Sequence, residues 1–193
     1  MRRWRPLAAL LLLAGCAAPV PADDRFGPPE VDGPALSLAV GSRPAVALLL
    51  QQNGESRLWR TRDGVVVATD GARVVATAGL AVWVAATRFD GPDPLDEPLA
   101  LVGRLASSRR LVDLMTPDRD PASMRFGVSL ECTLRGRIDG DVLLVEEGCN
   151  GSGFNFTNRF WGDPQTGGIY RSEQWVGREA GLLGITVLRP PPA

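Results

Sequence analysis

The sequence predicts an all-β fold: an antiparallel β-sandwich or flattened barrel that is built from hairpins and contains at most one or two short helices. Residues 125–135 alternate strictly between apolar and polar side chains, which is typical of a strand with one face in the core and one in water. Long amphipathic helical patterns are absent. Short apolar segments are also separated by closely spaced hairpin signals, which are Asn53-Gly54, Asp63-Gly64 and Asp70-Gly71.

The first half of the chain is expected to form a meander of short strands. Its apolar and alternating segments, each followed by a turn signal, are 45–52, 56–62, 65–69, 73–77 and 80–89. A proline-rich loop covers residues 90–98. Leu99, Val102 and Leu105 follow at helical spacing, so one short helix is expected near residues 98–107.

The second half is expected to continue the antiparallel pattern. A further strand is expected over residues 111–115, before the alternating segment 125–135. We assign one face of the alternating segment to the core, and that face consists of Phe126, Val128, Leu130, Cys132 and Leu134. The strands expected after it are 142–147, 154–161, 169–176 and 182–188.

The N-terminus has the pattern of an export signal. Three arginines among the first five residues precede the apolar run 7–13. This run is too short to span a bilayer as a helix, which needs roughly 20 apolar residues. It ends in Leu-Ala-Gly-Cys, which resembles the bacterial lipoprotein box, in which the signal is cut before the cysteine, here Cys16, and the cysteine carries acyl chains. The alternative is an ordinary signal peptide with an incidental cysteine.

This signal divides the chain into three parts. We expect a lipoprotein signal peptide (1–15), a lipidated Cys16 with a Pro-rich tether (16–36), and a single β-rich domain (37–190). Lipoproteins retained at the inner membrane often carry an aspartate after the cysteine. Ala17 occupies that position here, which favours an outer-membrane anchor with the domain facing the periplasm.

The two remaining cysteines, Cys132 and Cys149, are expected to form a disulfide in an oxidising compartment. A two-residue turn at Gly140-Asp141 places the two cysteines directly opposite each other, at a distance that a disulfide can bridge. A turn one residue earlier places Cys132 opposite Glu147 instead, with Cys149 as a diagonal neighbour. The alternative to a disulfide is a pair of free buried thiols.

The composition excludes several kinds of enzyme. All 21 basic residues are arginines, and there is no histidine. A Ser-His-Asp triad, a Cys-His pair, a Ser-Lys dyad and a Schiff-base lysine therefore cannot be built from this chain. Two cysteines without histidine do not suit a metal site, and we expect neither a metal nor a cofactor. The mildly acidic balance of the exported chain argues against nucleic acid as a partner.

Carboxylates are the remaining candidates for catalysis. A glycosidase needs two carboxyl groups about 5–10 Å apart across a cleft, one of them with a raised pKa. We expect no catalytic residue. Glu146 and Glu147 are adjacent on a strand and therefore point in opposite directions, and Glu131 lies on the predicted polar face. The acidic segment 90–97 is interpreted as a solvated loop, since its spacing does not match an EF-hand calcium loop. The candidates by residue type are Glu131, Glu146, Glu147, Glu173 and Asp163.

Aromatic residues concentrate near the C-terminus. Trp161 and Trp175 are candidates for a glycan or partner contact, since a flat ring matches the apolar face of a sugar. The alternative is that these rings belong to the core, as we expect for the nearby phenylalanines.

The same region resembles a known family. FTNRFWGDPQTGGIYRSEQWVG, followed by GITVLRP, is similar to the C-terminal signature of the YjbF/GfcB family of bacterial outer-membrane lipoproteins. Upstream, LWRTRDGVVVATDGARVVATAGL resembles a second block of that family. Gly162 departs from the pattern, since the family usually has an apolar residue there. The matching positions of the C-terminal block are Asn158, Phe160, Trp161, Asp163, Gly167, Ser172, Gln174, Trp175, Leu188 and Pro190.

The resemblance implies a role rather than a reaction. It implies a non-catalytic accessory protein of capsule or exopolysaccharide secretion, anchored in the outer membrane through acyl chains on Cys16. It also implies an outer-membrane β-barrel protein and a periplasmic protein of a polysaccharide export system as partners. The alternatives are a periplasmic glycan-binding module and, less favoured, a glycan hydrolase.

Overall fold

The computed structural model describes residues 32–192 except residues 42, 117 and 119, and it confirms the predicted all-β class. The described residues form one antiparallel sheet of twelve strands, with helical structure limited to two 3-10 turns, η1 (Pro94–Asp96) and η2 (Pro98–Leu101). The predicted signal peptide, Cys16 and most of the predicted tether lie outside the described residues. The strands are β1 (Ala35–Val40), β2 (Arg43–Asn53), β3 (Ser56–Thr61), β4 (Val66–Asp70), β5 (Arg73–Ala78), β6 (Trp83–Phe89), β7 (Leu105–Met115), β8 (Arg125–Asp139), β9 (Val142–Gly151), β10 (Phe154–Gly162), β11 (Ile169–Trp175) and β12 (Leu182–Arg189).

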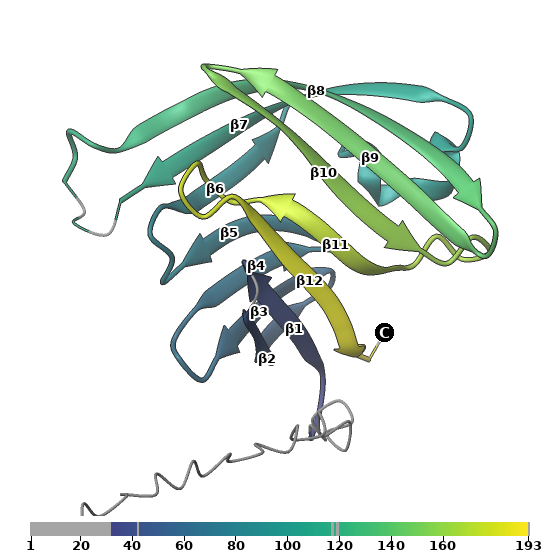
Figure 1. Ribbon diagram of the computed structural model, residues 1–193, viewed down its shortest axis with the longest axis horizontal. Coiled ribbons are helices and arrows are strands. Elements are labelled where there is room, and N and C mark those ends of the chain that lie inside the picture. The colour runs from purple at the N-terminus through teal and green to yellow at the C-terminus, as the bar shows by residue number, and fades with distance from the viewer. Residues whose placement is uncertain (1–31, 42, 117, 119, 193) are drawn as a thin grey trace, which may run out of the picture. The chain divides into compact units, whose positions relative to one another are not determined.

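The sheet curls into a nearly closed barrel, as Figure 1 shows. The strand order is β5-β4-β3-β2-β1-β12-β11-β10-β9-β8-β7-β6, so the first and last strands, β1 and β12, pair in its middle. β5 and β6 form its two edges and lie next to each other without a ladder between them. A side-chain bond joins these edges, since the Val84 amide donates to Thr77 Oγ1 at 3.1 Å.

Alternation along the strands places the apolar core inside the barrel. The smaller of two core clusters packs under the 3-10 turns, where Leu95 and Leu101 cover Phe160. The larger cluster includes Trp59, Val67 and residues of β1, β6 to β8 and β12. Full burial of such side chains contributes roughly 1.5–3 kcal/mol each, which is what holds the curved sheet together.

The short helix expected near residues 98–107 is confirmed only over its first four residues, and it is a 3-10 turn. Only the 3-10 turn η2 is helical, and it begins at Pro98 as the sequence indicates. Leu105 instead starts the long strand β7, where it pairs with Arg135 and is 74 % exposed. The extended ladder with β8 overrides a weak helical spacing of three residues.

The core assignment of Phe126 is also wrong, since this ring is 68 % exposed. The ladder between β7 and β8 shifts register here: Val112 faces Val128, but Leu114 faces Arg125. Gly127 occupies the irregular position with φ of 61°, a left-handed conformation that glycine adopts without strain. This bulge reverses the alternation and turns Phe126 outward.

The β8–β9 hairpin has the first of the two registers considered above. Asp139 pairs with Val142 across the Gly140-Asp141 turn, and Cys132 consequently faces Cys149. The two sulfurs are bonded in the structure, and both cysteines are buried in the larger core cluster.

Candidate functional site

A cluster of charged side chains lies in the interior of the barrel. Glu147 on β9 is fully buried, and its Oε2 lies 2.6 Å from Arg73 Nη1 and 3.5 Å from Arg110 Nη1. Arg73, at the start of β5, also forms a two-point contact with Asp93, with N–O distances of 2.8 and 2.9 Å. Four parts of the chain, β5, the loop before η1, β7 and β9, therefore meet in one ion-pair network.

This network keeps its charges at neutral pH. Burial opposes ionisation of Glu147, but the positive charges of Arg73 and Arg110 outweigh it and lower the pKa of the carboxyl. Burial lowers the pKa of Arg110 to about 10, against the raising effect of Glu147. Glu147 is thus held as a carboxylate, and it is unsuited to donate a proton as a general acid.

Two amide side chains form further hydrogen bonds across the barrel, and one of them, Asn158, bonds the ion-pair network. Asn158 Nδ2 donates to Glu147 Oε2 at 2.6 Å, and its Oδ1 accepts from the Trp175 amide at 2.7 Å. Gln174 on β11 accepts from the Val74 amide at 2.9 Å and donates to the Ala72 carbonyl at 2.8 Å. Gln174 therefore satisfies backbone groups of the edge strand β5 and ties that strand to the opposite wall.

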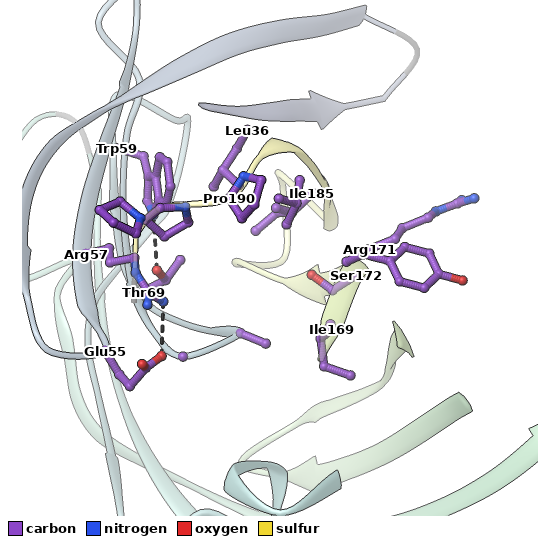
Figure 2. Close-up of a pocket in the computed structure, with 16 residues that line it drawn as sticks. Leu36, Glu55, Arg57, Trp59, Thr69, Ile169, Arg171, Ser172, Ile185 and Pro190 are labelled. Atoms are coloured by element: carbon purple, nitrogen blue, oxygen red, sulfur yellow. Dashed lines mark hydrogen bonds and ion pairs between the residues drawn. The ribbon is translucent and has the colours of Figure 1, made fainter. Parts of the chain in front are cut away.

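A cavity of about 670 Å³ lies beside this bridge. Figure 2 shows Trp59, Leu36 and Ile185 around the cavity, with Pro190 close to Trp59. The side chains come from β1, β3, β4, β11 and β12, and residues 190–192 of the C-terminal tail complete the lining. Most of the lining is apolar.

A second cavity, of about 350 Å³, shares residues Gly71, Ala72 and Ile169 with the first and is acidic. Asp96 lines it, and burial together with the charges of Asp93 and Asp70 raises its pKa. Residues 90–97 are expected from the sequence to form a solvated loop, and this is wrong for Asp93. Its side chain is only 10 % exposed, because it pairs with the buried Arg73.

The predicted carboxylate candidates are dispersed. Glu146 and Glu147 point to opposite sides of β9, as expected, and Glu146 contacts Arg135 and Arg137 at 3.1 and 2.9 Å. Glu131 is exposed and lies 2.7 Å from Arg109. Glu173 pairs with Arg171 at 3.1 Å, and Asp163 accepts from the amides of the turn that follows it.

The two candidate tryptophans have different surroundings. Trp175 is 7 % exposed and stacks on Phe156, with ring centroids 4.5 Å apart, so it belongs to the core. Trp161 is half-buried, and the Arg171 guanidinium lies 4.6 Å from its ring centroid. The structure therefore does not bring these two rings together into one surface.

Comparison with known proteins gives a family for this fold. Residues 30–188 match the family described as "Group 4 capsule polysaccharide lipoprotein gfcB, YjbF". The chain belongs to this family. A search of curated proteins finds no match.

A solved structure has a fold similar to the barrel described above. The crystal structure of the hypothetical lipoprotein YmcC from Escherichia coli K12 is similar, with a TM-score of 0.69 and 19 % sequence identity. The alignment covers 84 % of this chain and 87 % of that chain. At this identity the likeness shows a shared fold. Among residues 32–192 outside the three gaps, no helix has the length and apolar character to cross a bilayer.

The family signature has a structural explanation in this chain. Two of its positions form hydrogen bonds across the interior: Asn158 bonds Glu147 of the ion-pair network, and Gln174 bonds the backbone of β5. Sequence reasoning missed Arg73 and Arg110, which pair with Glu147, and Asp93, which pairs with Arg73. One signal was present: Glu147 shares its strand face with Val145 and Cys149, and a carboxylate on an apolar face requires a buried cation.

Proposed function

We propose that this chain is a lipid-anchored, non-catalytic accessory protein of capsule or exopolysaccharide secretion at the outer membrane. In this proposal residues 1–15 are a signal peptide, residues 16–36 carry the acylated Cys16 and the tether, and the β-domain faces the periplasm. The single observation that carries the proposal is the match of residues 30–188 to the capsule polysaccharide lipoprotein family.

The chemistry of the interior supports a non-catalytic role. Glu147, the most buried carboxylate, is committed to two arginines and an amide. Glu146, on the outer face, has its pKa lowered by hydrogen bonds from Arg137 and Arg135. If the protein were a hydrolase, its general acid would have to be Asp96, since this is the one carboxyl group in the described residues with a clearly raised pKa.

Deletion and complementation test this role. We expect loss of the gene to abolish export of the polymer, and wild-type protein and Asp96→Asn to restore it equally. Cys16→Ser should restore little, because the domain is then released from the membrane. Failure of Asp96→Asn, with normal protein levels, would establish a catalytic role and contradict the proposal. Normal export in the deletion strain would exclude a role in secretion.

The proposed partners are an outer-membrane β-barrel protein and a periplasmic protein of the export system. We expect affinity capture of the acylated protein from detergent-solubilised outer membranes to recover both. The half-exposed Trp161 is our candidate contact residue, so Trp161→Ala should reduce recovery without lowering thermal stability. Recovery of the same amounts with this variant would remove Trp161 from the interface.

A glycan-binding module is the second candidate, and the exposed part of Trp161 under Arg171 is the observation that favours it. Titration with fragments of the exported polymer, followed by tryptophan fluorescence, distinguishes the two. A saturable change that Trp161→Ala abolishes supports glycan binding. No change up to millimolar fragment leaves only the partner contact for this residue.

A further inference from the structure

The larger cavity has the size and lining of a site for an apolar ligand. Its volume of about 670 Å³ falls within the range of roughly 300–1,000 Å³ that is typical of small-molecule sites. Leu36, Trp59 and Ile185 supply apolar walls from three strands. Barrels with more than about eight strands have room for a ligand beside the packed core.

Most polar groups of this cavity are already bonded within the protein. Thr69 Oγ1 accepts from Trp59 Nε1 at 3.1 Å, and Ser172 Oγ accepts from Gln174 at 2.9 Å. A sugar would need partners for many hydroxyl groups, and leaving them unpaired on burial is costly. The lining therefore favours a hydrocarbon chain over a polysaccharide.

Arg57 is the exception among the lining side chains that are largely buried. Its side chain is 13 % exposed, and its Nη1 contacts Glu55 at 3.1 Å. Arg57 Nε is buried and has no hydrogen-bond partner within the described residues. A buried unpaired donor is costly, so this N–H favours a ligand that brings an oxygen acceptor. An apolar body with one oxygen-bearing end fits both the walls and Arg57.

The C-terminal tail completes the apolar lining. Pro190, Pro191 and Pro192 line the cavity, and proline has no backbone N–H that a hydrocarbon would leave unpaired. One exposed hydrogen bond, from Gln52 Nε2 to the Pro192 carbonyl at 3.2 Å, fastens the tail to β2.

The cavity also lies at the end of the domain where the tether joins it. Leu36 and Val187 both line the cavity and pair with each other, and the next pair outward is Ala35 with Arg189. Residue 35 is where the chain enters the barrel. Residue 35 lies 19 positions after Cys16, so an extended tether reaches about 60 Å, at about 3.1 Å per residue. A lipid anchor, which the family implies, therefore holds this end of the barrel within that distance of the bilayer.

We propose that this cavity binds one acyl chain of a membrane lipid, with the oxygens at the end of that chain on Arg57. The proposal uses the lipid anchoring of the family but not the role in secretion. A normal export phenotype therefore leaves it intact, and loss of lipid binding leaves the secretion proposal intact.

Fluorescence titration with cis-parinaric acid, a fluorescent fatty acid, tests the site on the mature chain carrying Cys16→Ser. We expect saturable binding of one probe per protein. Val187→Trp, which fills the cavity, and Arg57→Met, which removes the polar contact, should each weaken binding at least tenfold. The matched controls are Leu48→Trp and Arg60→Met, both at exposed positions, and they should bind as the parent does. Circular dichroism melts establish that each variant is folded.

Three results would overturn the proposal. The first is absence of saturable binding, or equal weakening by the cavity variants and their controls. The second is displacement of the probe by fragments of the exported polymer, which would make the cavity a glycan site.

The third concerns the source of the acyl chain. The acylated protein is placed in vesicles that contain a phospholipid with a photoactivatable acyl chain, and crosslinked peptides are mapped. We expect labels on the peptides that contain Leu36, Trp59 or Ile185. Probe binding by the Cys16→Ser chain without such labels would show that the protein's own acyl chain occupies the cavity.

Discussion

Gly151, at the end of β9, offers the sharpest test of the hairpin that carries the disulfide. Its φ of 141° is a conformation that residues with a side chain rarely adopt. An added Cβ would lie 2.5 Å from the Ser129 carbonyl oxygen and 3.3 Å from Leu130 Cα. Both atoms belong to the backbone of β8, so neither can move without disturbing the ladder. Gly151→Ala should therefore strain both strands.

The expected loss of stability is about 2–4 kcal/mol, since a strained backbone conformation alone costs about 1–3 kcal/mol. For a domain of this size, that loss lowers the melting temperature by about 5–15 °C. The control is Gly148→Ala on the same strand, where φ is not positive and no atom lies within 4 Å of the added Cβ. This control should be neutral or stabilising by up to about 1 kcal/mol.

Thermal unfolding followed by circular dichroism, with the disulfide intact, measures both variants. The two alanines lie in the same hairpin, so the disulfide constrains their unfolded chains alike. Melting temperatures that differ by less than about 2 °C would refute the reasoning, because the clash and the strained φ predict a larger gap.

Three further variants probe the interior. Gln174→Leu leaves the Val74 amide and the Ala72 carbonyl without their partner, so we expect a loss of about 2–4 kcal/mol and faster hydrogen exchange at the Val74 amide; unchanged exchange would contradict the bridge. Glu147→Gln breaks a buried ion-pair network and should cost about 3–5 kcal/mol in urea unfolding. The folded-state pKa of Glu147 is lowered, so its contribution is present above the ordinary glutamate pKa of about 4.3 and is lost as pH falls through the folded value. Wild type should therefore lose stability below that pH more steeply than Glu147→Gln, and parallel curves would contradict this. Replacing Cys132 and Cys149 by alanine should cost about 3 kcal/mol for a loop of this length, and an unshifted urea midpoint would mean that the crosslink adds nothing.

Local signals predicted the fold well because hairpins are local. A turn at Gly140-Asp141 determines the partner of every residue in the hairpin, and this turn places Cys132 opposite Cys149, as the structure shows. The sequence alone left a turn one residue earlier as an alternative. The two-residue alternation of apolar and polar side chains cannot show where the register between two strands shifts. Gly127 interrupts the alternation, and the resulting bulge is visible only once β7 is known to lie beside it.

The interior network was beyond such reasoning for a different reason. Arg73 and Glu147 are separated by 74 positions in the sequence, and they meet only because the sheet curls until its edges approach. The position of Glu147 on the apolar face of its strand shows that the carboxylate needs a buried cation. It does not show which arginine lies nearby. The order of all twelve strands is required for that assignment.

The pairing of β1 with β12 has a practical consequence for anyone who re-engineers this chain. Because Ala35 lies opposite Arg189, a short linker could join the two ends of the domain and new termini could be opened at another hairpin. Such a circular permutant keeps every ladder of the sheet if the opening is made at the exposed Gly140-Asp141 turn. By the strand registers this turn lies at the same end of the sheet as Ala35 and Arg189, so the permutant would keep that end towards a membrane anchor but move the attachment point from β1 to β9.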